Sequence, residues 1–153
     1  MTINYIKQKE NLSNVKLEPV KKSDWRFLYQ LLKQRDPRAN ISHKNIPTFQ
    51  EHVKLVMSKP YSKWYTISIK NKKVGSIYIS RQCEIGIFLE NNSQKKGIGK
   101  QALLFLINKN PRKRYLANIN PKNTKSRNFF KKNGFKLIQH TYELIPPKNL
   151  KRK

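Results

Sequence analysis

Three strand-like runs follow one another with very short links in the middle of the chain. Residues 64–70 and 74–80 are rich in β-branched and aromatic side chains, and the turn-forming residues 71–73 separate them. Two such runs joined by a short turn are typical of a β-hairpin. A third run, 83–89, begins almost at once. The middle of the chain therefore predicts an antiparallel meander.

Before this meander the pattern predicts one strand and two helices. Residues 15–20 alternate apolar and polar side chains, as a strand does. Ser23 is the expected cap of a helix with apolar residues at three- and four-residue spacing, which ends before Asp36. Thr48 and Glu51 form a capping box that opens the second helix.

After the meander the pattern changes to helix and strand in alternation. A helix begins at Gly99, and a short strand is expected at 115–119. Residues 123–133 form the last helix, with Gly134 at its C-terminal cap. One or two strands at 135–144 follow. The whole order predicts an α/β (α+β) domain.

The length of 153 residues fits one globular domain. We expect a loose arm at 1–14, the domain at 15–145 and a basic tail at 146–153. The single cysteine, Cys83, cannot form an internal disulfide, which is typical of a reducing compartment. No apolar run is long enough for a signal peptide or a membrane span. We therefore expect a soluble, cytoplasmic protein, a monomer or homodimer, with no membrane partner and no metal.

The charge of the chain is strongly unbalanced. Lys and Arg total 34 against 8 Asp and Glu, a formal net charge of +26. One interpretation is an anionic partner, such as nucleic acid, an acidic membrane or a phosphorylated small molecule. The other is codon bias, because Lys outnumbers Arg and Asn is abundant. Composition leaves both open.

Two of the five glycines, Gly97 and Gly99, lie where a strand gives way to a helix. A helix N-terminus has unpaired N–H groups and a partial positive charge. Without side chains there, phosphate oxygens can approach those groups closely. Lys95, Lys96 and Lys100 add positive charge. The spacing predicts a phosphate site, or alternatively a tight turn before a packed helix.

Two motifs around this turn resemble those of a known family. The run Gln94-Lys95-Lys96-Gly97-Ile98-Gly99 matches the (Gln/Arg)-x-x-Gly-x-(Gly/Ala) signature of the GNAT superfamily of N-acetyltransferases. Downstream, Asn123-x-x-Ser126-x-x-x-Phe130-x-x-x-Gly134-Phe135 is similar to its second motif, Asn-x-x-Ser-x-x-x-Tyr-x-x-x-Gly-Phe. The resemblance extends over residues 15–142.

The resemblance implies a GNAT fold. Its central sheet is mixed but mostly antiparallel, has six to seven strands splayed in the middle, and is flanked by about four helices. The strand at 83–89 would separate from that at 115–119, and the pantetheine arm of acetyl-coenzyme A (acetyl-CoA) would enter the gap. The backbone of Phe88 and Leu89 would pair with the pantetheine amides. The turn would hold the pyrophosphate through Gln94, Lys95, Lys96, Gly97, Ile98, Gly99 and Lys100.

The second motif implies further contacts with the cofactor. Asn123 and Ser126 would lie against its arm, or would simply cap a helix. Phe130 stands where the family often has a Tyr that protonates the leaving thiolate. Phe has no proton to give, so another group or water does this, or the thiolate leaves unaided. Alternatively, Phe130 is an ordinary core aromatic.

Few carboxylates can serve as the general base for the attacking amine. Elimination among the eight leaves Glu84 and Glu90, on or beside the splayed strand. Glu84 shares a strand face with Gly86 and Phe88, and a covered carboxylate would have a raised pKa suited to this role. The alternative for Glu84 is a salt bridge to a neighbouring Lys or Arg.

The implied reaction is direct transfer of acetyl to a primary amine in a ternary complex. A cationic protein repels polyamines, so an anionic acceptor fits better. Residues 46–52 and 83–86 also resemble N-acetyltransferases acting on nucleotide-linked amino sugars. The expected substrate contacts are Arg35, Arg38, His43, His52 and Tyr61, with loop packing as the alternative.

Two other functions stay open. The protein could acetylate another protein. It could also be a basic coenzyme A-binding protein that binds nucleic acid without catalysis. Aromatic and lysine residues are interleaved along the chain, but no separate nucleic-acid motif is present.

Overall fold

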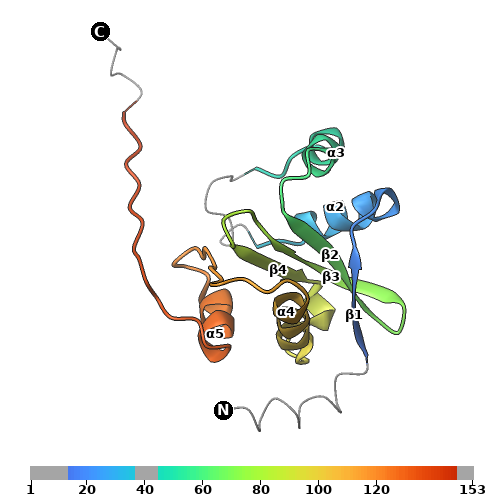
Figure 1. The fold of residues 1–153 in the computed structure, drawn as a ribbon. Coiled ribbons are helices and arrows are strands. Elements are labelled where there is room, and N and C mark those ends of the chain that lie inside the picture. Colours follow the sequence, from blue (N-terminus) through green and yellow to red (C-terminus); the bar gives the residue numbers. More distant parts are fainter. Residues whose placement is uncertain (1–13, 37–44, 148–153) are drawn as a thin grey trace, which may run out of the picture.

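The computed structural model of the protein describes residues 14–36 and 45–147. Helices α2 and α3 lie over one face of a sheet, and α4 covers the other face with α5 beside it (Figure 1). No helix in the two described ranges is long and apolar enough to cross a membrane. The strands are β1 (Val15–Pro19), β2 (Lys63–Ile69), β3 (Lys72–Ile79) and β4 (Ile85–Leu89). The helices are α2 (Trp25–Lys33), α3 (Phe49–Met57), α4 (Ile98–Lys109) and α5 (Thr124–Lys132), with 3-10 turns η1 (Lys22–Asp24) and η3 (Asn91–Ser93).

The expected meander is confirmed. All neighbouring strands are antiparallel, and the order is β1-β2-β3-β4. Lys70 and Asn71 connect β2 to β3 with left-handed φ angles of 48° and 63°. Positive φ at both turn residues matches the right-handed twist of paired strands. The turn therefore comes earlier than the expected 71–73.

The two faces of the sheet differ in character. Ile67, Ile77 and Ile79 have no exposed surface and pack in one core with α4. Burial of such isoleucines stabilises the fold by about 1.5–3 kcal/mol each. The face toward α2 instead buries small polar side chains, namely Thr66, Ser68 and Ser76. Ile85 of β4 belongs to the same core, which therefore holds β4 against α4.

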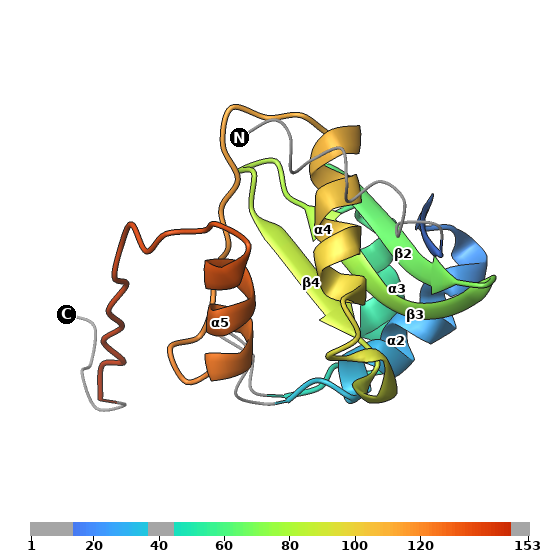
Figure 2. The ribbon, with the colours of Figure 1, turned by 90° about the horizontal axis from the view of Figure 1, so that it is seen from below.

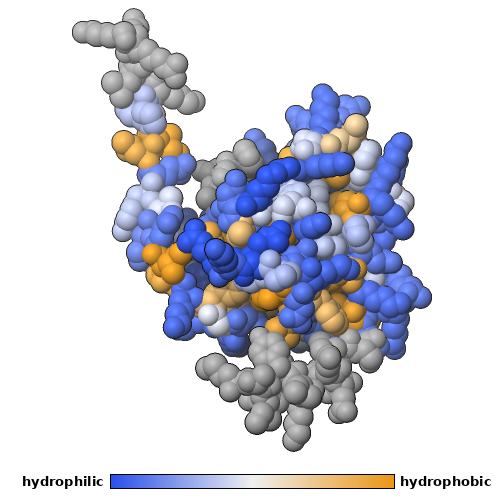
Figure 3. All heavy atoms as spheres, viewed as in Figure 1, coloured by the Kyte–Doolittle hydropathy of each residue, from blue (hydrophilic) through white to orange (hydrophobic). Residues whose placement is uncertain are grey.

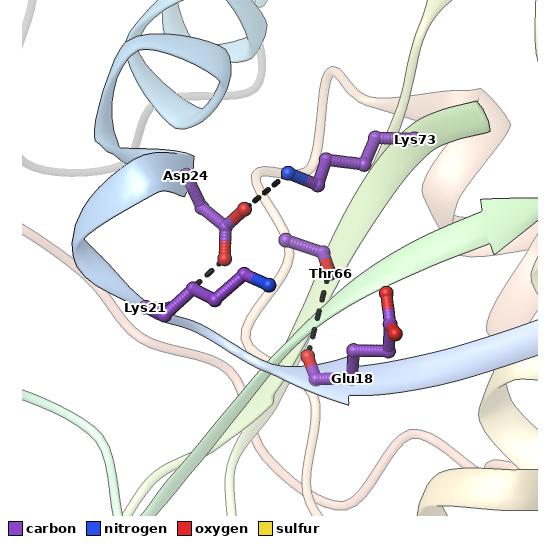
Figure 4. A network of polar contacts seen from close by, with 5 residues as sticks. All are labelled: Glu18, Lys21, Asp24, Thr66 and Lys73. Carbon is purple, nitrogen blue, oxygen red and sulfur yellow. Dashed lines mark hydrogen bonds and ion pairs between the residues drawn. The ribbon is translucent and has the colours of Figure 1, made fainter. Parts of the chain in front are cut away.

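The start of α2 is held by a buried carboxylate. One oxygen of Asp24 accepts a hydrogen bond from the Lys21 N–H (2.9 Å), and the other forms an ion pair with Lys73 of β3 (Figure 4). Asp24 is only 1% exposed. The expectation that Ser23 caps this helix is wrong, because the chain enters through η1 and Asp24 satisfies the Lys21 N–H.

We expect Asp24→Ala to lower the free energy of unfolding by on the order of 3 kcal/mol, because it removes one partner of a buried ion pair together with a cap. Glu18→Ala is the control. Its side chain is exposed and makes none of the contacts drawn in Figure 4, so we expect a change within about 0.5 kcal/mol. Urea denaturation measures both, and equal effects would contradict this account.

Two other helix ends agree with the sequence. Thr48 Oγ1 accepts from the Glu51 N–H (3.3 Å), and Glu51 Oε2 accepts from the Thr48 N–H (2.7 Å), so the capping box is confirmed. Gly134 follows α5 with φ 88°, and the Phe135 N–H donates to the Phe130 carbonyl (3.0 Å). This is the expected glycine cap.

The strands expected at 115–119 and 135–144 do not form as such. The first makes a single parallel bridge, Glu84 to Leu116, which gives the sheet its mixed character. Within the described ranges, 135–147 has no strand assignment, so four strands are present there instead of six to seven. Beyond Leu116, no further backbone pair joins the two segments in the described ranges. Residues 1–13 and 148–153, most of the expected arm and tail, lie outside the described residues.

Candidate functional site

The residues of interest surround a fork between β4 and the chain that follows α4. At the closed end of the fork, the Ile85 N–H donates to the Leu116 carbonyl (2.7 Å) and the Leu116 N–H donates to the Cys83 carbonyl (2.9 Å). Beyond this bridge the two backbones share no hydrogen bond within the described ranges. The expected separation of these segments is therefore present.

The open edge of β4 presents a defined set of backbone groups. Alternate residues of a strand direct their N–H and C=O to opposite edges. Ile85 donates toward Leu116, and the Glu84 carbonyl accepts from Ser80 on the β3 side (2.8 Å). Ile87 and Leu89 therefore face the fork, whereas the backbone of Phe88 faces β3. This corrects the expected pair, because Ile87 replaces Phe88.

The glycine turn leaves an uncapped helix start. Gly97 is the N-cap of α4 with φ 77°, and a Cβ added there meets no atom within 4 Å. No side chain caps the helix, and its first bond runs from the Gln101 N–H to the Gly97 carbonyl (3.2 Å). The N–H groups of Ile98, Gly99 and Lys100 thus have no acceptor within the helix. These residues fit a pyrophosphate group.

Gln94 joins the two motif regions. Its Nε2 donates to the Leu89 carbonyl (3.1 Å), and its Oε1 accepts from Lys125 Nζ of α5 (2.6 Å). The side chain thus fixes the end of β4 relative to the turn. Lys95 has a left-handed φ of 61° and, like Lys96 and Lys100, is exposed. The three lysines give this end of α4 its positive charge.

The second glycine of the turn has a different task from the first. A Cβ at Gly99 would lie 3.1 Å from the Phe129 ring of α5 and 3.6 Å from Leu89. Its missing side chain therefore lets α4 and α5 approach each other. Figure 2 shows α5 beyond the edge of β4, on the side of the fork.

The remaining motif residues serve α5 and the core. Asn123 Oδ1 accepts from the Ser126 N–H (3.0 Å), so Asn123 is the N-cap. Phe130 is 6% exposed and packs edge-on against Phe129 and Phe135, with ring centroids 5.1 and 5.0 Å away. These contacts match the capping and core-aromatic alternatives of the sequence analysis.

Glu84 lies at the closed end of the fork. Its carboxylate accepts from Asn118 Nδ2 (2.7 Å) and from Ser80 Oγ (3.3 Å). It forms no ion pair with a Lys or Arg in the described parts of the chain. The contact with Asn118 links the two arms of the fork, and sequence reasoning missed this residue.

An aromatic cluster of Tyr61, Trp64 and Tyr78 lies on the sheet face opposite α4. The Tyr61 and Tyr78 rings stack at 3.6 Å and 7°, and the Trp64 ring meets Tyr61 edge-on at 4.9 Å. A Cβ at Gly86 of β4 would lie 2.1 Å from the Tyr78 ring, so Tyr78 crosses β4 at this glycine. Sequence reasoning missed Trp64 and Tyr78. The signal that could have found Tyr78 is its pairing with Gly86, a residue without a side chain, on the neighbouring strand.

The residues expected to contact the substrate do not all lie close together. Arg35 is exposed and lies near Tyr61, whose pKa is raised by burial and by the Tyr78 hydroxyl, an effect that Arg35 opposes. His52 is instead buried, with its ring 5.4 Å from that of Tyr29 in α2. Arg38 and His43 lie outside the described residues. Among the expected substrate contacts that the structure describes, Arg35 and Tyr61 are therefore the two that lie near each other.

Buried His52 makes stability depend on pH. Burial lowers its pKa, and the nearby Trp25 carbonyl, outside hydrogen-bonding geometry, opposes this in part. The unfolded state therefore binds the proton first, so stability present above about pH 6.5 falls as the pH decreases. We expect His52→Leu to flatten this part of the profile, measured by urea denaturation at several pH values. An unchanged slope would contradict the assignment.

Comparison with known proteins identifies the class of enzyme. A family model for the acetyltransferase (GNAT) domain matches residues 14–136. The chain therefore belongs to the acetyltransferase (GNAT) family. It is an acyltransferase whose donor is acetyl-CoA. No curated protein sequence matches the chain significantly.

Solved structures of acetyltransferases share the fold. RimL, a ribosomal L7/L12 alpha-N-protein acetyltransferase in complex with coenzyme A, is 20% identical with a TM-score of 0.66, over 83% of this chain and 82% of that chain. The microcin C7 self-immunity acetyltransferase MccE, with acetyl-CoA and AMP, is 19% identical at 0.63, over 80% and 79%. Spermidine N-acetyltransferase from Vibrio cholerae, with coenzyme A and spermine, is 15% identical at 0.69, over 84% of each chain. Identities this low establish the fold alone.

Proposed function

We propose that the protein acetylates a primary amine on an anionic, nucleotide-linked amino sugar by direct attack in a ternary complex. The observation that carries the proposal is the aromatic cluster beside the open fork. The cluster combines flat rings with an arginine, Arg35, that lies close enough to Tyr61 to oppose the rise in its pKa. The net charge of +26 favours an anionic acceptor over a polyamine.

The position of the glycine turn sets the direction of the donor. The turn follows the C-terminal end of β4, so a pyrophosphate held there directs the pantetheine arm back along the strand. From Leu89 to Ile85 the strand covers about 13 Å at about 3.3 Å per residue. The backbone of Ile87 and the N–H of Leu89 would pair with the pantetheine amides. The acetyl group would then lie near Glu84 and Gly86.

The acceptor would enter from the face that carries the aromatic cluster. Stacking of a nucleobase on an aromatic side chain contributes about 1–3 kcal/mol. Arg35 can pair with a phosphate through two parallel hydrogen bonds. Because Tyr78 crosses β4 at Gly86, a group bound on this cluster would also lie beside the acetyl group.

The side chains at the closed end suit proton transfer. Acetyl-CoA supplies an acetyl group activated as a thioester, and the attacking amine must be uncharged. Glu84 would accept the proton of that amine while Asn118 and Ser80 hold its carboxylate in place. Phe130 is buried and has no proton to give. We assign the Tyr78 hydroxyl, which reaches across β4 at Gly86, as the acid that protonates the leaving thiolate sulfur.

A panel of amines tests the acceptor class through release of the coenzyme A thiol. We expect a nucleotide-linked amino sugar to react at least about 100-fold faster than spermidine or a peptide with a free N-terminus. Faster reaction of the peptide would support a protein acceptor instead. Salt-sensitive RNA binding with no turnover on any amine would support the non-catalytic nucleic-acid binder.

Tyr61→Ala separates acceptor recognition from donor binding. We expect a higher KM for the nucleotide acceptor and an unchanged affinity for coenzyme A, because the stacking platform is lost. Tyr29→Ala is the control, since that ring packs against α3 and His52. If both variants had the same KM, the aromatic cluster would have no role in recognition.

A further inference from the structure

The segment after α5 exposes an unusual amount of apolar surface. Leu137, Ile138, Tyr142, Leu144 and Ile145 are each more than 70% exposed. The segment leaves the body of the protein, and apolar residues gather along it (Figures 1 and 3). Contiguous exposed apolar stretches of this kind mark interaction sites.

The same chain contains an edge that lacks a strand. Leu116 directs its N–H and C=O toward β4. In an extended chain, the backbones of Ala117 and Ile119, one and three positions on, would face the opposite side. Within the described ranges, the backbone groups of Ala117 and Ile119 make no hydrogen bond. The side chains of both residues pack against the core. The outer side of this fork arm is therefore a partly buried and unpaired edge.

We propose that the segment 137–145 pairs with the edge at 117–119 of a second copy of this chain, and that two copies exchange these segments reciprocally. Each copy offers one segment and one edge, so a two-fold arrangement satisfies both at once. The added strand completes the sheet beside the fork, and each copy thereby stabilises the donor site of the other.

The start of the segment favours exchange over closure within one chain. The Phe135 ring packs on the Phe130 ring, and the backbone N–H of Phe135 donates to the Phe130 carbonyl. These contacts fix the direction in which the chain leaves α5. Both ribbon views show the segment on the side of α5 away from the sheet (Figures 1 and 2).

The charge of the exposed segment is compatible with association of two copies. Residues 137–147 contain one Glu and no Lys or Arg, in a chain of net charge +26. This is therefore a surface on which two copies can meet without direct repulsion. The nine residues of the segment and the three of the edge give each copy about 12 interface residues, fewer than the roughly 20 to 30 a side of a standard interface.

The double variant Leu137→Asp/Tyr142→Asp tests the exchange in the full chain. Both side chains are exposed, so the domain should still fold. We expect sedimentation to show a dimer for the unchanged chain and at least about 100-fold weaker dimerisation for the variant. Met57→Asp, an exposed apolar residue of α3, is the matched control and should leave the dimer intact.

Hydrogen exchange and salt identify the surface involved. We expect the Ala117 and Ile119 amides to be protected in the dimer and to exchange faster in the double variant. Raising salt from about 50 to about 300 mM should tighten the dimer, because it screens the repulsion between two cationic copies. A dimer insensitive to the double variant would overturn the proposal. So would a monomeric unchanged chain in which the double variant lowers the unfolding free energy, since that result means closure within one chain.

Discussion

Gly97→Val lowers the affinity for coenzyme A by at least about 100-fold, because the side chain enters the open space where the N–H groups of α4 meet the phosphates. Two lost charge-assisted hydrogen bonds are worth about 3 kcal/mol or more, which corresponds to this factor. In the free protein a Cβ at Gly97 meets no atom within 4 Å. The loss therefore comes from the ligand rather than from a clash in the fold.

A matched control separates this effect from backbone strain. Gly134 also has a left-handed φ, 88° against 77° at Gly97, with open space around an added Cβ. Valine at either position is strained, by roughly 1–2 kcal/mol. We expect Gly134→Val to lose similar stability but to keep its coenzyme A affinity in calorimetric titration. Asparagine tolerates a left-handed φ, so Gly97→Asn should weaken coenzyme A binding with less backbone strain than Gly97→Val. Undiminished affinity in both Gly97 variants would show that the phosphates bind elsewhere.

Glu84→Gln lowers the turnover number by about 100- to 10,000-fold, the usual contribution of a general base. Glutamine keeps the size of the side chain and a carbonyl that can still accept from Asn118, so the fork stays closed at this end. The affinity for coenzyme A should therefore not change. The measurement is thiol release under saturating acceptor, with titration calorimetry for the donor.

Glu90→Gln is the control for this prediction. It makes the same chemical change just after the other end of β4, where Glu90 precedes η3. We expect its turnover to stay within about threefold of the unchanged enzyme, because the proposed base is untouched. Full activity of Glu84→Gln would remove Glu84 as the base, whereas equal losses in both variants would indicate a general effect of charge.

The sequence predicted the parts of this protein that local patterns specify. The meander followed from short links between apolar runs, and the ends of α3 and α5 followed from Thr48, Glu51 and Gly134. The two glycines of the turn were recognised, but not their separate tasks. Gly97 has a left-handed φ, whereas Gly99 is kept free of a side chain by the approach of Phe129. Contact between two helices leaves no local pattern.

The errors come from pairing between distant segments. Residues 115–119 and 135–144 have strand-like composition, yet a strand needs a partner along its length, and here the pairing stops at Leu116. The backbone of Phe88 was expected at the fork, but the position of the Leu116 bridge assigns that role to Ile87. The burial of His52 against α2 was also not foreseen, because its surroundings depend on how two helices meet.

A crystal structure with coenzyme A tests the central claim most directly. We predict the pyrophosphate within hydrogen-bonding distance of the N–H groups of residues 98–100, with the pantetheine arm between β4 and residues 116–119. The sulfur should lie on the side of Glu84 and Gly86. Coenzyme A bound through surface lysines alone, with the fork between β4 and Leu116 empty, would contradict the account.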